Sequence, residues 1–238
     1  MQRTALVTGG GRGIGRATVQ ALASQAWVAA IDTAFPDGPG AACLAADVDV
    51  RDSNAVQQVV DGVVRQRGGL DWVVCAAGIV RDRVSWKLSD QDWNDVLAVN
   101  LTGAFHVARA AAPALRRSDC GRLVFVGSIN GTRGKFGQAN YAASKAGLIG
   151  LARTMAQELA RDGVTVNVVT PGFIRTPMTE ALPEALRAQA VARTPLGRAG
   201  EPEDVAALVR FLCGDAAGFI TGAVIPIDGG QLLGAADP

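Results

Sequence analysis

Tyr141 is the only tyrosine of this chain, and it precedes Lys145 by four residues in the segment QANYAASK (138–145). On a helix, that spacing puts both side chains on one face. A phenol has a pKa of about 10, too high for proton exchange at neutral pH, and a nearby ammonium lowers it. A fall of about 3 units requires about 4 kcal/mol, which one cation in a poorly solvated site could supply. The pair therefore predicts an acid–base group, although a stacked surface pair would show the same spacing.

Ser128 ends an apolar run thirteen residues before Tyr141. A hydroxyl at the carboxyl edge of a parallel sheet points into the ligand crevice, so it could donate a hydrogen bond to a carbonyl oxygen; bonding to nearby backbone is the alternative. Ser128 is not a nucleophile elbow, because Val126 and Asn130 stand where that motif requires glycine. The only histidine, His106, lies inside a helical pattern without an evident partner, which excludes serine-hydrolase chemistry.

The segment TGGGRGIG (8–15) joins a strand-like run to a helical pattern. Glycines let the backbone turn tightly and approach a ligand, and the free N–H groups at a helix start suit a pyrophosphate. The spacing matches neither G-x-G-x-x-G nor a P-loop. The strand–turn–helix context nevertheless predicts a nucleotide-binding turn, with a purely structural turn as the alternative.

Asp32 ends the second strand-like run, 17 residues after Gly15. A carboxylate there can accept hydrogen bonds from the ribose hydroxyls of adenosine and would repel a 2′-phosphate. Arg12 favours the opposite choice, because a guanidinium could hold that phosphate, unless it pairs with Asp32 or the pyrophosphate instead. We expect NAD(H) as the favoured cofactor, with NADP(H) left open.

Short β-branched runs alternate with Ala-rich helical stretches, which predicts a parallel sheet covered on both faces. We expect an α/β, three-layer, doubly wound Rossmann fold. Its seven parallel strands are expected at Thr4–Thr8, Trp27–Ile31, Cys43–Val48, Asp71–Cys75, Arg122–Gly127, Val164–Thr170 and Ala223–Ile227. Helices are expected at Ile14–Ala23, Asp52–Arg67, Ser89–Leu115, Ala139–Ala160 and Pro202–Leu212.

No linker, charge block or repeat divides the 238 residues, so we expect one catalytic domain over 1–238. The widest irregular stretch, Pro171–Glu201, contains four prolines. Long interruptions of a compact domain are usually functional, which predicts a substrate lid at about 171–200. The alternative is a structural excursion that carries one helix at Pro183–Val191.

The bulk composition excludes several classes of protein. A net charge of +1 gives no footprint for nucleic acid or an anionic membrane. The dispersed apolar residues and the N-terminus, which lacks a signal-like segment, predict a cytoplasmic protein without a membrane span. The four cysteines form no C-x-x-C and only one histidine is present, so we expect no metal site.

The ordered set of Thr8–Gly15, Asp32, Ser128, Tyr141 with Lys145, and Pro171-Gly172 closely resembles the short-chain dehydrogenase/reductase superfamily. The resemblance extends from Thr4 to the segment IDGG (227–230). The closest likeness is to the β-ketoacyl-[acyl-carrier-protein] reductases, through GIVRD (78–82), QANYAASKAGL (138–148) and VNVVTPGFI (166–174).

The resemblance implies a role for each matching residue. The implied cofactor contacts are Gly9, Arg12, Gly13, Ile14 and Gly15 at the pyrophosphate and adenosine, Asp32 at the ribose, Asp47 and Val48 at the adenine, the backbone of Ala76 and Gly78, Tyr141, Lys145 at the nicotinamide ribose, and Ile174 and Thr176 at the carboxamide. Ser128 and Tyr141 are implied to bind the substrate oxygen, Tyr141 exchanging its proton as hydride is transferred. Asn100 is implied to anchor a water beside Lys145; a backbone-bonded helical asparagine is the alternative.

The sequence differs from the pattern of these reductases at three places, and each difference changes what the resemblance implies. Cys75-Ala76-Ala77-Gly78 replaces Asn-Asn-Ala-Gly, so side-chain bonds at the sheet centre are lost. Asp32 is unusual in a subgroup that mostly prefers NADPH. Carrier-protein docking in that subgroup uses basic residues flanking the crevice, but Asp119 and Asp162 occupy two such places, beside Arg116, Arg117 and Arg161. An acyl carrier protein is therefore a doubtful partner.

The leading functional prediction is reduction of a 3-oxoacyl thioester, carried by acyl carrier protein or coenzyme A. The alternatives are NAD-dependent oxidation of a secondary alcohol, cyclic diol or sugar, and, more remotely, a nucleotide-binding sensor without turnover. The resemblance also implies a homo-oligomer, a dimer or tetramer. The substrate pocket is expected to include Trp86, Phe136, Phe173, Met178 and Leu182, although such residues are as often core.

Overall fold

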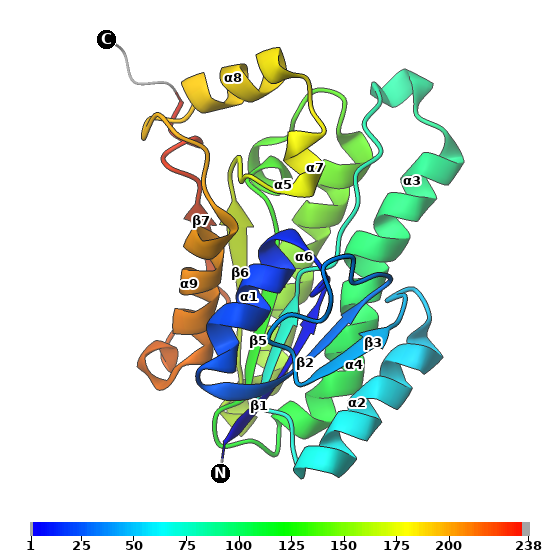
Figure 1. Cartoon of the computed structure of the whole chain (residues 1–238), viewed down its shortest axis with the longest axis vertical. Helices are drawn as coiled ribbons and strands as arrows, with labels where there is room; N and C mark the ends of the chain where they lie inside the picture. The colour runs from blue at the N-terminus through cyan, green and yellow to red at the C-terminus, as the bar shows by residue number, and fades with distance from the viewer. Residues whose placement is uncertain (1, 235–238) are drawn as a thin grey trace.

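Seven short strands lie side by side in one parallel sheet in the computed structural model, which describes residues 2–234 (Figure 1). Their order is β3-β2-β1-β4-β5-β6-β7, so the direction of winding reverses between β1 and β4. The bounds are β1 (Arg3–Thr8), β2 (Ala26–Asp32), β3 (Leu44–Asp47), β4 (Trp72–Cys75), β5 (Arg122–Val126), β6 (Thr165–Pro171) and β7 (Val224–Ile227). The predicted doubly wound fold is confirmed, and each strand lies within two residues of its prediction.

Helices cover both faces of this sheet. The longer α-helices are α1 (Gly13–Ala23), α2 (Ser53–Arg67), α3 (Asp90–Leu97), α4 (Ala104–Leu115), α6 (Ala139–Leu159), α8 (Glu184–Ala192) and α9 (Pro202–Cys213). Shorter helical turns are η1 (Ser85–Lys87), η2 (Ala98–Gly103), α5 (Asn130–Arg133), η3 (Ala160–Asp162), α7 (Pro177–Glu180) and η4 (Asp215–Ala217). Buried residues of α1 and α9 pack on one face, and those of α2, α4 and α6 on the other.

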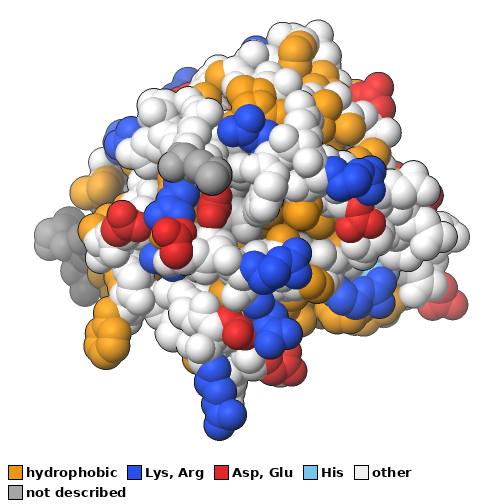
Figure 2. All heavy atoms as spheres, turned by 90° about the horizontal axis from the view of Figure 1, so that it is seen from below, with side chains coloured by type: hydrophobic (Ala, Val, Ile, Leu, Met, Phe, Trp, Pro, Cys, Tyr) orange, Lys and Arg blue, Asp and Glu red, His pale blue; other side chains and the backbone are white. Residues whose placement is uncertain are grey.

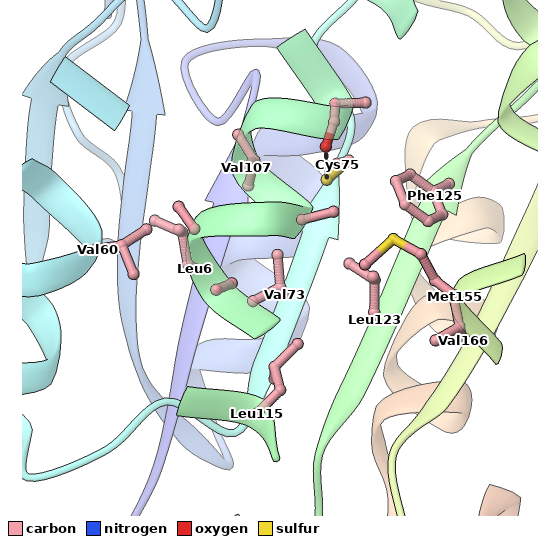
Figure 3. Close-up of a cluster of buried hydrophobic side chains, with 14 of the residues drawn as sticks. Leu6, Val60, Val73, Cys75, Val107, Leu115, Leu123, Phe125, Met155 and Val166 are labelled. Atoms are coloured by element: carbon pink, nitrogen blue, oxygen red, sulfur yellow. Dashed lines mark hydrogen bonds between the residues drawn. The ribbon is translucent and has the colours of Figure 1, made fainter. Parts of the chain in front are cut away.

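The core therefore consists of two apolar layers separated by the sheet. In β1, Leu6 faces the layer under α2, α4 and α6, while Ala5 and Val7 face the layer under α1 and α9. Figure 3 shows the first layer, in which the strand side chains Leu123 and Phe125 lie beside Met155 of α6. Burial on both faces explains the continuous apolar runs of the strands, because alternating polar residues would have no solvent to face.

The helix predicted for Ser89–Leu115 is confirmed as one uninterrupted helical run from Asp90 to Leu115, but it is not a regular α-helix. The structure has α3, then the π-helical turn η2, then α4. Asn100 lies in η2 and is fully buried, and Gly103 meets Val50 so closely that an added Cβ would lie 2.5 Å from Val50 Cγ2. A local widening of this kind leaves the apolar pattern nearly unchanged, which is why the sequence reads as one continuous helix.

The segment between β6 and α9 carries α7 and α8, which lie above the sheet in Figure 1. The predicted helix at Pro183–Val191 corresponds to α8. A bridge joins Ile174 to Gly200 at the base of the segment, and Leu196 N donates to Gly229 O at 3.1 Å. Within residues 2–234, no helix combines the length and the apolar character that a membrane crossing requires.

Candidate active site

A cavity of about 590 Å³ lies at the carboxyl ends of β1, β2, β4, β5 and β6, where the strand order reverses. In open parallel sheets this is the usual place for a ligand. The predicted site residues that line it are Gly9, Arg12, Gly13, Ile14, Gly15, Asp32, Val48, Ala76, Gly78, Ser128, Tyr141, Lys145, Ile174 and Thr176. Residues distant in the sequence thus meet in one cavity of a size suited to a cofactor and a substrate.

The glycine turn after β1 leaves no space for side chains. Gly9 and Gly13 have φ values of +68° and +51°, a region that other residues rarely adopt. A Cβ added at Gly15 would lie 2.0 Å from Gly9 O, and one at Gly9 would lie 2.8 Å from Ala77 N. The helix α1 begins at Gly13 with its free N–H groups at the cavity. This arrangement fits the pyrophosphate of a dinucleotide.

Asp32 stands at the end of β2 beside that turn. Its Oδ2 accepts a hydrogen bond from Gly11 N at 3.0 Å, and its Oδ1 accepts one from Thr33 N at 2.7 Å. Within residues 2–234 it forms no ion pair with Arg12, which is exposed at the cavity. The carboxylate is therefore held in place by backbone donors beside the glycine turn.

The predicted adenine contact Asp47 is misplaced. Asp47 is exposed and does not line the cavity, whereas Val48, Asp49, Val50 and Arg51 do. The chain continues along the cavity after β3 until Asp52 caps α2 by accepting hydrogen bonds from Asn54 N and Ala55 N, both at 3.0 Å. Placing the cavity residues relative to the α2 cap at Asp52, rather than relative to the end of β3, would have identified Asp49 as a cavity residue.

Asp49 and Arg51 form an ion pair at the cavity wall. Arg51 Nε and its second guanidinium nitrogen donate to Asp49 Oδ2 at 2.9 and 2.6 Å. This pairing lowers the pKa of Asp49, chiefly through the hydrogen bond, and raises that of Arg51. Sequence reasoning missed both residues.

Ser128, Tyr141 and Lys145 converge at the other end of the cavity. Lys145 Nζ lies 5.7 Å from the centroid of the Tyr141 ring and donates to Val126 O at 2.8 Å. Ser128 Oγ accepts a hydrogen bond from Asn130 N at 3.1 Å, so its hydroxyl proton can point to an oxygen in the cavity, that of Tyr141 or that of a ligand. The predicted helical pairing of Tyr141 and Lys145 is confirmed, with both groups at one cavity.

The predicted direction of the Tyr141 pKa shift is wrong for this structure. Burial raises the pKa of Tyr141 to about 12; the Ser128 hydroxyl acts in the opposite direction, and the Asp82 carboxylate adds to the rise. Burial also lowers the pKa of Lys145 to about 8. Desolvation of the phenolate therefore outweighs the Ser128 hydrogen bond. Lys145 Nζ is bonded instead to the backbone of Val126. Tyr141 therefore retains its proton at neutral pH.

Asn100 does not line the cavity but supports its wall. Its Oδ1 accepts from Ile79 N at 2.8 Å, and its Nδ2 donates to Ile79 O at 3.0 Å and Ser144 Oγ at 3.1 Å. A Cβ added at Gly78 would lie 3.4 Å from both Asn100 Oδ1 and Lys145 Nζ. Asn100 therefore ties the loop after β4 to α6 next to Lys145; its implied contact with a water stays a prediction.

Thr8 holds the loop after β4 through its side chain. Its Oγ1 accepts from Ala76 N and Ala77 N, both at 3.1 Å. Cys75 is buried, and its Sγ lies 3.8 Å from Ala104 O, at the distance of a weak S–H bond (Figure 3). The loop after β4 is therefore held without asparagine side chains at residues 75 and 76.

Among the predicted substrate-pocket residues, only Met178 lines the cavity. Trp86 and Phe136 are 76% and 84% exposed, so they lie outside it rather than in its wall. The remaining lining near Tyr141, which sequence reasoning missed, includes Ile79, Val80, Arg81, Asp95, Val99 and Thr179. These come from the loop after β4, from α3 and η2, and from α7.

The fold and this arrangement define the class of protein. The sequence model of the family described as Enoyl-(Acyl carrier protein) reductase matches residues 9–231. The chain belongs to the short-chain dehydrogenase/reductase family, and it is an oxidoreductase that uses NAD(P)(H).

Three relatives show which members of that family the chain is similar to. It is 42% identical to the 3-oxoacyl-[acyl-carrier-protein] reductase MabA of Mycobacterium tuberculosis, over 98% of this chain and 94% of that protein. It is 40% identical to the reductase FabG of Escherichia coli, over 97% and 98% of the two chains. The FabG of Thermotoga maritima is 42% identical, with the same coverage.

Proposed function

We propose that the protein reduces a 3-oxoacyl thioester to the 3-hydroxyacyl thioester. The observation that carries this proposal is the meeting of Ser128, Tyr141 and Lys145 in one cavity, where the half-buried phenol of Tyr141 keeps its proton beside the Ser128 hydroxyl. A protonated phenol is the form needed to donate to an oxygen that gains negative charge. The full-length similarity to 3-oxoacyl-[acyl-carrier-protein] reductases supports this choice of substrate.

Each residue of the site has a defined task in this reaction. Ser128 donates a hydrogen bond to the keto oxygen, and Tyr141 gives its proton to the same oxygen as negative charge develops there. A nicotinamide held in the cavity would supply the hydride that the keto carbon takes up. The Lys145 ammonium stabilises the phenolate that remains on Tyr141. In the oxidative direction Tyr141 accepts the proton.

We propose NAD(H) as the preferred cofactor. Asp32 is held in place by Gly11 N and Thr33 N and carries its charge where the adenosine ribose would lie. A 2′-phosphate placed there would meet this carboxylate at short range. Arg12 at the cavity is free to contact the pyrophosphate.

The thioester carrier is best sought near the loop after β4. Arg81 lines the cavity, and Arg83, Lys87, Arg133 and Lys135 are exposed on the adjoining loops, which are joined where Arg83 N donates to Gly137 O at 2.7 Å. Exposed cations near the entrance attract phosphate-bearing groups. This supports a thioester whose carrier bears phosphate, as coenzyme A and the pantetheine arm of a carrier protein do.

The expectation that Asp119 and Asp162 flank the crevice is wrong. They precede β5 and β6, at the amino ends of the strands, whereas the cavity lies at the carboxyl ends. Asp119 pairs with Arg3, and Asp162 Oδ2 accepts from Arg116 Nε at 2.6 Å. Figure 2 views the molecule from below, where acidic and basic side chains lie next to one another.

A panel of acyl thioesters, secondary alcohols, cyclic diols and sugars, assayed with both cofactors, tests the proposed function. We expect the highest kcat/KM for a 3-oxoacyl thioester with NADH. The substrate assignment fails if an alcohol or sugar is turned over better than every thioester. The cofactor assignment fails if kcat/KM is higher with NADPH than with NADH.

We also propose that the protein assembles as a dimer or tetramer. Trp93 of α3 and Phe105 of α4 are 38% and 40% exposed on consecutive helices, and a partner subunit would cover such apolar area. Light scattering at micromolar concentration would show a mass of two or four chains. A monomer across that range would contradict the proposal.

A further inference from the structure

Gln138, the residue at the start of α6, joins two loops around the site. Its side chain is buried, with the residue 5% exposed. Its Nε2 donates to Asp82 Oδ2 at 2.8 Å, and its Oε1 accepts from Asn130 Nδ2 at 3.0 Å. The loop after β4, the segment after β5 and the start of α6 are thereby connected through one amide.

The same connection continues to the lid segment. Arg133 Nε donates to Asn130 Oδ1 at 3.2 Å, and its guanidinium donates to Gln231 O at 3.3 Å. The Gln231 side chain accepts from Phe173 N at 3.1 Å and lies 3.4 Å from Ala190 O, to which it donates. One hydrogen-bond chain thus runs from the loop after β4 to Phe173, at the start of the segment that carries α7 and α8, and to Ala190 within α8.

This chain contacts the residues that hold the reacting groups. Asn130 N donates to Ser128 Oγ at 3.1 Å. Gln138 O accepts from Ala142 N at 2.8 Å, next to Tyr141. Asn140, which is fully buried, accepts from Tyr141 N at 2.8 Å and donates to Arg81 O at 3.0 Å.

We propose that the Asp82–Gln138–Asn130 chain, extended by Arg133 to Gln231, positions Ser128 and Tyr141 for proton transfer, with the Asp82 carboxylate as its charged end. Gln138 and Asn130 are positioning residues, because they act through Ser128 and Tyr141 without facing the substrate themselves. The proposal rests on the proposed function only in using Tyr141 as the proton donor.

The electrostatic part concerns the charges around Tyr141. Lys145 lies on the same helix, Arg81 and Asp82 on the loop after β4, and Asp95 on α3. The remaining charged groups in the cavity lie in its other lining segments and are Arg12, Asp32, Asp49 and Arg51. Of all these groups, Asp82 is the one whose charge raises the pKa of Tyr141. Its place is fixed by the bond from Gln138, so geometry and proton affinity are linked.

Gln138→Met tests the positioning role, because methionine keeps the length of the side chain and removes both hydrogen bonds. We expect kcat to fall by about 10- to 100-fold, the range for a misplaced reacting group, with cofactor affinity within about twofold. Gln157→Met is the matched control on the same helix, where Gln157 is exposed and reaches only Arg153 O. A Gln138→Met enzyme with control-like kcat would overturn the proposal.

Asp82→Asn tests the charge, because the amide keeps an oxygen for Gln138 and loses the negative charge. Removing that charge favours the phenolate, so the pKa of Tyr141 should fall by about half a unit, as expected for one partly screened charge. Since Tyr141 is the only tyrosine, the ultraviolet absorbance of its phenolate reports this titration alone. Asp61→Asn, on an exposed face of α2, is the control.

The two readouts separate this proposal from the proposed function. The phenolate titration requires no substrate, so an unchanged Tyr141 pKa in Asp82→Asn would overturn the electrostatic role whatever the enzyme reduces. If no thioester is turned over, kcat of Gln138→Met is measured on whichever ketone or alcohol the panel identifies. The proposed function would then fail while the positioning role stands or falls by its own result.

Discussion

The two ends of the cavity are built differently. At the adenosine end, residues 8–51, contacts are made largely through backbone groups, as when Gly11 N donates to Asp32 and when Ala76 N and Ala77 N donate to Thr8. At the substrate end, side chains from separate segments bond across the cavity rim, as Gln138 does to Asp82 and Arg133 does to the Gln231 backbone. The adenosine end depends mainly on backbone conformation, whereas the substrate end depends on hydrogen bonds between loops that are far apart in the sequence.

This difference indicates how each end tolerates change. A turn that uses glycine backbone has few side chains to vary, so the cofactor end can remain constant while substrates differ. The substrate end depends on amide and guanidinium groups whose partners lie 56 and 98 residues away. Changes there should affect turnover before they affect cofactor binding, and the following variants test that separation.

Tyr141→Phe should have the largest effect, because it removes the proton donor and almost no volume. We expect kcat to fall by about 10²- to 10⁴-fold, with dinucleotide affinity, followed by cofactor fluorescence, within about twofold. Loss of cofactor binding in step with kcat would mean that the two ends are not separable. Unchanged turnover would remove Tyr141 from the reaction.

Gly15→Ala should damage the cofactor end specifically. The added Cβ would lie 2.0 Å from Gly9 O, so the turn must shift. We expect cofactor affinity to fall by about 100-fold, equivalent to about 3 kcal/mol. The control is Gly150→Ala on α6, where nothing lies within 4 Å of the added Cβ; it should raise the unfolding free energy by about 0.5–1 kcal/mol and leave binding unchanged. Equal effects of both variants would refute the steric explanation.

Lys145 should make the cofactor-free protein more stable at alkaline pH. Burial lowers its pKa to about 8 from 10.5, so between those values the unfolded chain binds more protons and the unfolding free energy rises with pH. From about pH 7.5 to about pH 9.5 we expect a gain of about 2 kcal/mol, measured by chemical denaturation. Lys145→Met should lack this gain. The same pH dependence in both proteins would show that Lys145 titrates normally.

Asp32→Ala should have the smallest effect, on preference rather than on turnover. Removing the carboxylate removes its repulsion of a 2′-phosphate, so the ratio of kcat/KM with NADH to that with NADPH should fall by about tenfold, or about 1.4 kcal/mol. Asp37→Ala is the control, since Asp37 is exposed and pairs with Arg16. A ratio that does not change would assign the cofactor preference to another group.

The sequence predicts the sheet and the meeting of the predicted residues well, because both follow from local patterns. Buried strands read as apolar runs, and parallel strands bring their carboxyl ends to one edge. The predicted site residues, from Gly9 to Thr176, therefore meet in one cavity, although no single motif of the sequence contains them all. The error at Asp47 has the same origin, since the pattern shows where β3 ends but not how far the chain continues along the cavity.

Burial and long-range bonds could not be predicted from spacing. The interval between Tyr141 and Lys145 gives their common face, but not the desolvation that raises the pKa of the phenol. The bonds of Gln138 depend on where Asp82 and Asn130 are carried by other elements. The spacing of residues in the sequence does not show which distant side chains will be hydrogen-bonded, so the bonds of Gln138 to Asp82 and Asn130 are seen only in the folded structure.

The π-helical turn at Ala98–Gly103 stands where a regular α-helical turn with one residue fewer could join α3 to α4. A wide turn holds more residues than an α-turn, so it rotates α3 relative to α4 and aims Asn100 at Ile79. Deleting one residue would restore a regular helix with ordinary hydrogen bonds and turn Asn100 away. Such a deletion would release the loop after β4 from Asn100, so we expect a more regular helix and a cavity wall that is less firmly held.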